Sequence, residues 1–295
     1  MKRTKGNVAG MITILDGGMG QELIARTSAE PTPLWATQVM LDEPALVRAV
    51  HDDFFAAGAM VATANTYAIH HDRLMPAGID DKFEALHRTA CEIACAARDA
   101  AGAGRVAGAL GPLIGSYRVG PLPEDAVERF REICRLQAPL VDLFLIETAS
   151  SLEQARAAVA GATGHDKPIW LGVSVDDRDG TKLRSGEPLE EVMRMTSKID
   201  ALLINCSTPE AVSAGLDVIK TTERPFGAYA NGFTRITKSF VQEGATVSEL
   251  SARSDLSPAA YADFAEHWAK MGATIIGGCC EVGPAHVAEL VRRLT

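Results

Sequence analysis

The feature that most constrains the fold of this chain is an eightfold alternation of short apolar runs with longer amphipathic segments. Each run is four to eight residues long, nearly continuous, and rich in β-branched or small residues. Strands buried on both faces of a parallel sheet have this pattern. The predicted strands are residues 12–16, 60–65, 106–111, 143–147, 169–174, 201–206, 226–231 and 273–278.

The segments between the runs have apolar residues at helical spacing. The first begins at Pro44 and stops before Gly58, as helices commonly do. The predicted helices are residues 44–57, 83–101, 124–138, 152–160, 189–198, 209–220, 258–271 and 284–294. Eight strand–helix units predict an α/β protein with one (β/α)8 barrel. The alternative is an open, doubly wound sheet, but no Gly-x-Gly-x-x-Gly follows the first run.

Composition and charge narrow the class of partner. The chain has 295 residues, 47% of them hydrophobic, and a net charge of −9 without a cluster of Lys or Arg. Nucleic acids and anionic membranes require concentrated positive charge, so we expect neither of them as a partner. We expect residues 1–10 to be a flexible tail and residues 11–295 to form the barrel. The short apolar stretch at 11–15 does not form a signal peptide, so we expect reduced cysteines and a cytoplasmic protein.

Polar and thiol-bearing residues gather where the predicted strands end. Loops at this end of a barrel carry the catalytic residues. Seven of the eight strand ends have such residues, and the strand interiors are apolar. We therefore predict one site at this end of the barrel, built from Asp16, Asn65, Thr66, Glu147, Thr148, Ser174, Asn205, Cys206, Asn231, Cys279 and Cys280.

The cysteines indicate the chemistry of this site. Cys206 ends the sixth predicted strand, and Cys279 and Cys280 follow the eighth. Strands two apart direct their ends at the same space, and the preceding Gly277-Gly278 permits the sharp turn that both adjacent thiols need. Three thiolates with an open fourth position favour Zn²⁺ over Mg²⁺ or Ca²⁺. Zinc would deprotonate a substrate thiol, and the resulting thiolate could attack an electrophilic methyl group.

Several motifs resemble those of the homocysteine S-methyltransferase family, and the resemblance runs from residue 12 to the C-terminus. The implied protein is a zinc-dependent barrel enzyme, a thiol methyltransferase that methylates homocysteine to methionine, with Cys206, Cys279 and Cys280 as metal ligands. The motifs are Ile-Leu-Asp-Gly-Gly-Met-Gly-Gln-Glu-Leu at 14–23, Thr-Ala-Asn-Thr-Tyr at 63–67, Glu147, Asn-Cys at 205–206, and Gly-Gly-Cys-Cys at 277–280 followed by Pro284 and His286.

The same resemblance assigns the amino-acid pocket. It implies that Asp16 and Glu147 hold the substrate ammonium group, which makes them the catalytic carboxylates. The alternative for each is a carboxylate that caps the following helix or turn. Thr63 and Tyr67 match pocket positions, with strand-end packing as their alternative, and the backbone at Gly17 and Gly18 can offer N–H groups to the substrate carboxylate.

Departures from the family pattern leave the methyl donor open among S-methylmethionine, betaine and similar onium compounds. Thr148 follows Glu147 where the betaine-using branch has a tyrosine that has been linked to zinc. The segment 111–120 differs from the longer loop of S-methylmethionine users, and Tyr-Ala-Asn-Gly at 229–232 replaces Tyr-Pro-Asn. Aromatic faces bind onium groups, and the loop candidates are Trp35, Tyr117 and Phe233.

Two other functions compete with this interpretation. A barrel lyase or aldolase acting through a Schiff base needs a lysine at a strand end, and none stands there. A non-enzymatic barrel with a structural zinc site needs a fourth protein ligand. His286 lies within the last predicted helix, where we expect it to pack or cap. We expect Cys91, Cys95 and Cys134 to pack in the core, and segment 232–257 to be a lid or binding loop.

Overall fold

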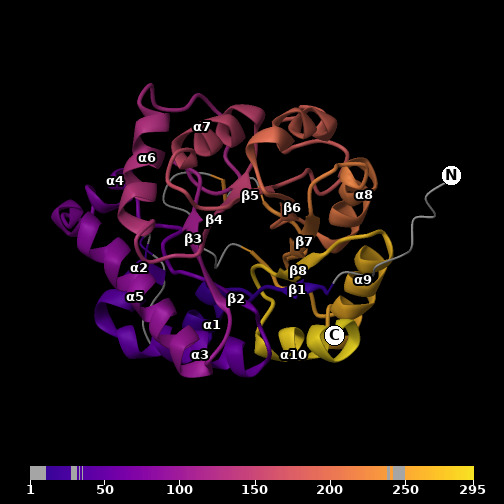
Figure 1. Ribbon diagram of the computed structural model, residues 1–295, viewed down its shortest axis with the longest axis horizontal. Helices are drawn as coiled ribbons and strands as arrows, with labels where there is room; N and C mark the ends of the chain where they lie inside the picture. Colours follow the sequence, from indigo (N-terminus) through magenta and orange to yellow (C-terminus); the bar gives the residue numbers. More distant parts are fainter. Residues whose placement is uncertain (1–10, 28–31, 33, 35, 238–239, 242–249) are drawn as a thin grey trace, which may run out of the picture.

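All eight predicted strands are present, each within two residues of its expected ends. The computed structural model describes residues 11–27, 32, 34, 36–237, 240–241 and 250–295. Within these residues the strands form one parallel sheet surrounded by helices (Figure 1). The strands are β1 (Thr13–Ile14), β2 (Val61–Thr63), β3 (Arg105–Leu110), β4 (Leu143–Ala149), β5 (Ile169–Val173), β6 (Ala201–Asn205), β7 (Phe226–Ala230) and β8 (Ile275–Gly278).

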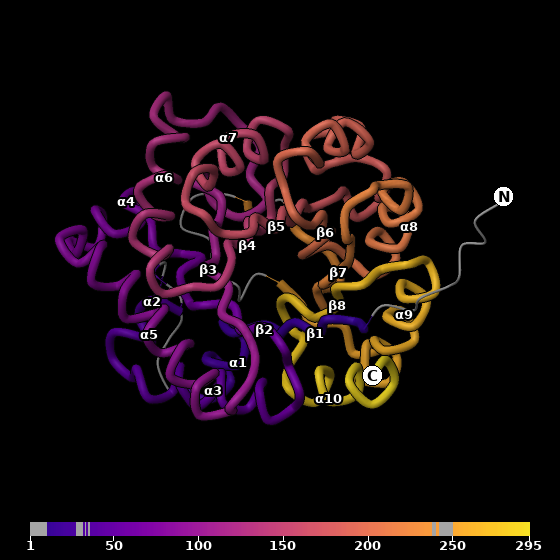
Figure 2. The backbone as a smooth tube through the Cα atoms, in the orientation of Figure 1, coloured from indigo at the N-terminus to yellow at the C-terminus, as the bar shows by residue number. Residues whose placement is uncertain are grey.

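The sheet closes on itself. Its strand order is β1-β8-β7-β6-β5-β4-β3-β2, and every ladder is parallel. The two ends meet at a parallel bridge between Leu15 and Val61, beside a 2.7 Å hydrogen bond from the Met60 N–H to the Ile14 carbonyl. Figure 2 shows β1 between β8 and β2. This closure confirms the single (β/α)8 barrel, and the open-sheet alternative is wrong.

Seven outer helices match the predicted helices to within two residues. Proline opens α3, α8, α9 and α10, where its missing N–H costs nothing. Gly102 ends α5 in the left-handed region, with a φ of 75°. The seven are α3 (Pro44–Ala56), α5 (Phe83–Ala101), α6 (Ala126–Gln137), α7 (Leu152–Ala162), α8 (Pro209–Ile219), α9 (Pro258–Lys270) and α10 (Pro284–Leu294).

The segment at 189–198 differs from the prediction, because it is the 3₁₀ helix η2 (Leu189–Lys198) rather than an α-helix. Its buried residues are Leu189, Val192 and Met195, which recur at every third position. That spacing places them on one face of a helix with three residues per turn, so burial favours the tighter winding.

Four short elements were not predicted. They lie in the loops after β1 and β2 and contain three to eight residues each, too few for a clear helical period. Two of them, α1 and α2, separate β1 from α3. The four are α1 (Met19–Arg26), α2 (Ala36–Asp42), α4 (His71–Leu74) and η1 (Asp80–Lys82).

The strands bury both faces, as their continuous apolar runs indicated. In β4, Leu143 and Leu145 belong to the cluster inside the barrel, and Phe144 and Ile146 belong to the cluster between the barrel and the helices. The barrel is therefore a filled core and not a pore, and a ligand can enter only at its ends.

Two expectations concern the ends of the chain and its surroundings. Residues 1–10 lie outside the described part, so the flexible tail and the domain boundary at residue 11 stay predictions. Among the described residues, no helix combines the length and the apolar character needed to cross a bilayer.

Candidate metal and substrate site

The three predicted metal-binding cysteines meet at the carboxyl ends of the strands. Their sulfur atoms all lie within 4.8 Å of one another. Cys206, directly after β6, is 2.7 Å from the Cys279 sulfur and 3.9 Å from the Cys280 sulfur, both just after β8. All three are free thiols. Cys206 is 4% exposed, and Cys279 and Cys280 are half-buried.

The backbone at Cys206 is strained. Its φ of 49° lies in the left-handed region, which costs a non-glycine residue about 1–2 kcal/mol. The Cys206 N–H donates to the Tyr229 carbonyl at 3.1 Å, and the Cys279 N–H donates to the Ala230 carbonyl at 2.9 Å. Both β6 and β8 are thus joined to β7, which brings the thiols together from opposite sides of that strand.

The prediction that Gly277 and Gly278 provide a sharp turn is wrong. Both lie in β8, and neither has a positive φ. They are glycines because a Cβ on Gly277 would lie 2.4 Å from the Leu15 Cβ, and one on Gly278 would lie 2.0 Å from the Val282 Cγ1. The chain turns later, at Glu281, whose φ is 64°.

The cluster concentrates negative charge on one sulfur. Burial alone would raise the pKa of Cys206, but hydrogen bonds from the other two thiols outweigh it and hold that pKa well below the usual range. The Tyr117 hydroxyl, 2.8 Å from the Cys206 sulfur, acts in the same direction. These interactions with Cys206 raise the pKa of Cys279 and of Cys280. A thiolate is therefore most stable on Cys206, with the other two cysteines as thiols that donate to it.

Asp16 lies at the end of β1 and is 3% exposed. Its carboxyl accepts the Thr63 N–H at 2.6 Å and the Thr63 hydroxyl at 2.8 Å. Burial raises the pKa of Asp16 to about 7, against the lowering effect of these hydrogen bonds. Asp16 does not cap the following helix, because α1 has Gly18 as its N-cap and no side-chain cap.

Glu147, in β4, is the second carboxyl in this space. Desolvation raises its pKa to about 8, and the negative charges of Asp16 and Cys206 add to the increase. The Tyr229 hydroxyl opposes it. Among the described residues, no ion pair joins either carboxyl to a cation. The pocket therefore has one buried acid, Asp16, and one half-buried acid, Glu147, and an entering cation would stabilise the charge of both.

These residues line one pocket of about 920 Å³, counted with its open mouth. The predicted Gly17, Gly18, Thr63 and Tyr67 line it as well. Thr63 holds Asp16, and the Tyr67 hydroxyl is 2.7 Å from the Ser116 hydroxyl. All six predicted substrate-site positions are therefore together, and their binding roles stay predictions.

The two glycines serve close packing first. A Cβ on Gly17 would lie 2.0 Å from the Val282 carbonyl oxygen. The Gly18 N–H already donates to that same carbonyl at 2.9 Å, so it is not free for a substrate carboxylate as predicted.

Aromatic residues close the outer part of the pocket. The predicted Tyr117 and Phe233 line it, together with Phe240, which was not predicted. The Tyr117 and Phe240 rings are 5.9 Å apart and tilted by 56°. Phe233 and Phe240 are described residues of segment 232–257, whose role as a lid or binding loop stays a prediction. Trp35 lies outside the described residues.

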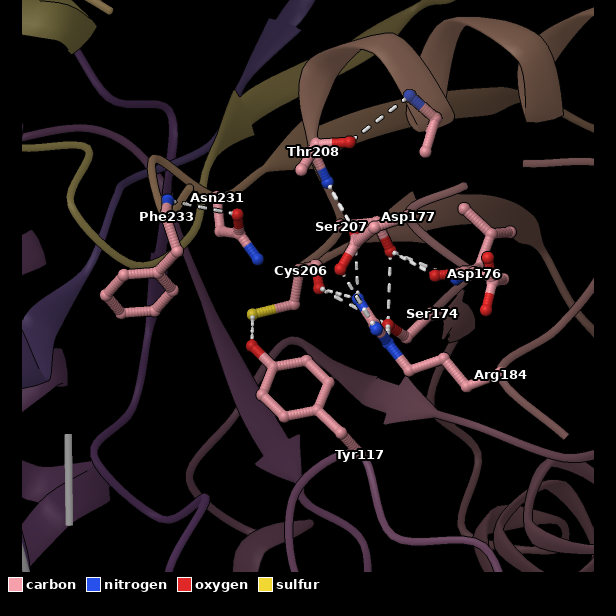
Figure 3. A network of polar contacts seen from close by, with 12 residues as sticks. Tyr117, Ser174, Asp176, Asp177, Arg184, Cys206, Ser207, Thr208, Asn231 and Phe233 are labelled. Carbon is pink, nitrogen blue, oxygen red and sulfur yellow. Dashed lines mark hydrogen bonds and ion pairs between the residues drawn. The ribbon is translucent and has the colours of Figure 1, made fainter. Parts of the chain in front are cut away.

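Sequence reasoning missed two polar side chains here. Tyr229 lies inside the predicted strand run, where only its alternation could have shown that it points into the barrel. Arg184 lies in the polar loop after β5, where a charged residue is ordinary. Figure 3 shows its guanidinium between Asp177, Ser174 and the Cys206 backbone.

The competing interpretations find no support in the described part of the chain. No lysine lines the pocket there, as a Schiff-base enzyme would require. The metal-capable group contains three cysteines and no fourth His, Cys, Asp or Glu from those residues. His286 caps α10, since its Nδ1 accepts the Gly283 N–H at 3.2 Å.

The other cysteines are separate from this site. Cys91 and Cys134 are fully buried in the outer core. The Cys95 thiol donates to the Leu140 carbonyl at 3.1 Å. All three therefore pack as expected.

Comparison with known proteins gives consistent matches over nearly the full length. A homocysteine S-methyltransferase of Escherichia coli K12 is 29% identical, covering 96% of this chain and 95% of its own. A selenocysteine Se-methyltransferase of Brassica oleracea is 24% identical, covering 97% and 89%. The metallated form of the homocysteine methyltransferase MmuM from Escherichia coli superposes with a TM-score of 0.77 at 28% identity, covering 96% of each chain.

The family pattern described as homocysteine S-methyltransferase matches residues 13–294, from the first strand of the barrel to its last helix. This chain therefore belongs to the homocysteine S-methyltransferase family of enzymes.

Proposed function

We propose that this enzyme uses zinc to transfer a methyl group from an onium donor to the thiolate of homocysteine, which yields methionine. The observation that carries the proposal is the meeting in one pocket of three thiols and two carboxyls that have no ion pair with any described cation. An amino acid with a thiol side chain has a sulfur that can join the metal held by the three cysteines. It also has an ammonium group that the two carboxyls can bind.

The donor set fits zinc. Tetrahedral zinc–thiolate sites have Zn–S bonds of about 2.3 Å, which places their sulfurs about 3.8 Å apart. Cys206 and Cys280 are already 3.9 Å apart, and the Cys279 sulfur, 2.7 Å from that of Cys206, would move outward to join the set. Three sulfurs and no fourth ligand among the described residues leave a position for substrate. Bound zinc would supply Lewis acidity that lowers the pKa of the substrate thiol.

The chain itself binds and orients the amino acid. Asp16 and Glu147 would hold the ammonium group, and the Thr63 hydrogen bonds fix the direction of the Asp16 carboxyl. An ammonium between the two carboxyls stabilises their charged forms and so lowers both pKa values from about 7 and about 8. These residues move no proton in the transfer; they position the sulfur for in-line attack on the methyl carbon.

The donor occupies the outer pocket. An S-methylsulfonium or quaternary ammonium donor has a positive charge that aromatic faces attract. Phe233, Phe240 and Tyr117 supply such faces beside the thiols. The methyl leaves the onium atom without its bonding electrons, so the donor product is neutral and less strongly held than the donor. S-methylmethionine, betaine and similar compounds all satisfy this chemistry.

The test is methionine formation from homocysteine with each of four donors: S-methylmethionine, betaine, S-adenosylmethionine and dimethylsulfoniopropionate. We expect turnover with at least one of them, and loss of turnover when a chelator removes the metal and its return with added Zn²⁺. X-ray absorption should count three sulfur ligands in the free enzyme and four with homocysteine. Full activity of metal-free protein would refute the zinc proposal.

The reaction site would lie in a reducing compartment, because three thiols must stay unoxidised at the barrel mouth. We propose the cytoplasm for this reason. Homocysteine and the methyl donor are the proposed small-molecule partners.

A further inference from the structure

Arg184 contacts the Cys206 residue by two routes. Its guanidinium donates to the Cys206 carbonyl at 3.3 Å, which holds the main chain. The same group lies 4.7 Å from the centre of the Tyr117 ring, whose hydroxyl is 2.8 Å from the Cys206 sulfur. Figure 3 shows the Tyr117 hydroxyl at the Cys206 sulfur and the Arg184 guanidinium at the Cys206 carbonyl.

Arg184 is itself held firmly. Its guanidinium forms a two-pronged ion pair with Asp177, with both N–O distances 3.1 Å, and its Nε donates to Ser174 at 2.7 Å. The side chains of Arg184 and Asp177 are 10% and 14% exposed. Asp177 also accepts the Thr208 N–H at 3.0 Å, at the start of α8. A buried fork of this kind has one geometry, unlike a surface ion pair.

The hydrogen bonds from Arg184 and Ser174 act on the strained backbone of Cys206. Cys206 has a φ of 49°, and a strained residue persists only when its surroundings determine its conformation. Its N–H is taken by Tyr229, and its carbonyl accepts Arg184 and the Ser174 hydroxyl, the latter at 3.3 Å. Cys279 and Cys280 have no positive φ, so the strained ligand backbone is that of Cys206, where this network acts.

We propose that Arg184 is a positioning residue for Cys206: by holding the Cys206 carbonyl and the Tyr117 ring, it keeps the Cys206 sulfur directed at the metal position. The proposal rests on the proposed function, since it assigns the network to metal binding. Arginine is required, because lysine can form neither the fork with Asp177 nor the planar stack on Tyr117. Partners that orient metal ligands typically contribute about 10–100-fold to metal affinity.

The experiment compares Arg184→Met and Arg184→Lys with Arg293→Lys. Arg293 is a matched control, because it is a half-buried arginine held by Asp263, Glu266 and Glu289, away from the pocket. Zn²⁺ affinity is measured by competition with a coloured chelator, and the thiolate environment by the absorption of Co²⁺-loaded protein. We expect both Arg184 variants to bind Zn²⁺ about 10–100-fold more weakly and to shift the thiolate–Co²⁺ band. Arg293→Lys should change neither.

Kinetic constants distinguish a role of Arg184 in positioning Cys206 from a general contribution to stability. The described contacts of Arg184 include neither Asp16 nor Glu147, so the KM for homocysteine should change less than kcat. Tyr117→Phe keeps the ring for Arg184 but removes the hydroxyl, and should shift the Co²⁺ band with a smaller loss of affinity. Arg184 variants that are only less stable, with wild-type Zn²⁺ affinity and spectrum, would overturn the proposal.

Should the Arg184 variants not fold, Asp177→Asn and Ser174→Ala loosen the same guanidinium more mildly. Weaker Zn²⁺ binding by both supports the proposal, and wild-type affinity in both overturns it. A wild-type protein that binds no Zn²⁺ or Co²⁺ would instead refute the proposed function itself, whatever the variants do.

Discussion

The sulfur side and the carboxylate side of the pocket are built in opposite ways. Cys206 is surrounded by satisfied groups: its N–H, carbonyl and sulfur each have a partner. Asp16 and Glu147 have no ion pair with a cation among the described residues, and burial raises the pKa of each, to about 7 and about 8.

This difference separates two tasks. A metal ligand must be held in place before the metal arrives, so bonding around Cys206 is complete apart from the metal. A substrate site gains affinity when the ligand satisfies what the protein leaves unsatisfied, so the carboxyls lack a cation. Changes on the sulfur side should therefore affect metal content and kcat, and changes on the carboxylate side should affect the KM for homocysteine.

The largest effect is expected from Cys279→Ala. Loss of one of three sulfur ligands should remove the metal and reduce kcat by more than about 1,000-fold, because the substrate thiol is then no longer activated. Metal analysis and methionine formation measure both. Cys134→Ala, a core cysteine away from the pocket, should keep metal and kcat while losing about 1 kcal/mol of stability. A Cys279→Ala protein that is active without metal would show that the sulfur side does not determine kcat through metal binding.

Asp16→Asn and Glu147→Gln test the other side. Each should raise the KM for homocysteine by about 30–100-fold, which corresponds to the 2–3 kcal/mol of a hydrogen bond to a charged group. Metal content should not change. Asp142→Asn is the control, since Asp142 accepts the Val106 N–H at 2.7 Å at the opposite end of the barrel. Loss of the metal from Asp16→Asn would show that the carboxylate side also supports metal binding, so that the two sides are not separate.

The pH dependence of stability sharpens the contrast. The folded pKa of Asp16, about 7, exceeds its ordinary value of 3.8, so the unfolded chain loses this proton first. Asp16 therefore destabilises the metal-free protein increasingly from about pH 4 to pH 7, by about 4 kcal/mol in all. Urea unfolding measures the free energy of unfolding of both proteins. Asp16→Asn should exceed wild type in this free energy by more at pH 8 than at pH 5. An equal difference at both pH values would contradict the raised pKa.

The smallest effect is expected at the aromatic mouth, which belongs to neither side. Phe240→Leu removes one ring face and should raise the KM for the methyl donor about 3–10-fold, with the KM for homocysteine unchanged. Phe264→Leu, on the outer helix α9, should change neither constant. Equal increases in both constants would mean that Phe240 shapes the whole pocket instead of the donor region.

Much of this arrangement could be predicted from local patterns. Continuous apolar runs located the strands within two residues, because a strand buried on both faces has an interior of mostly apolar residues. The ends of those runs then placed the cysteines and the acids at one end of the barrel. Short helices such as α1 and α2 escaped prediction, since eight residues or fewer show little periodicity.

Other features could not be predicted, because they join residues far apart in the chain. Tyr117 and Cys206 are 89 positions apart, and Arg184 and Cys206 are 22 apart in different loops. The prediction that Gly277 and Gly278 permit a sharp turn was wrong because it considered only the local backbone. A side chain is excluded there by clashes with Leu15 and Val282.

The sequence by itself determined the barrel, its strand ends and the identity of the three thiols, since burial and periodicity are properties of neighbouring residues. Only the tertiary structure decided which thiol holds the charge, which acids stay unpaired and which arginine supports Cys206. Those properties depend on distances across the barrel mouth, where desolvation and electrostatic interactions act between residues that no local pattern connects.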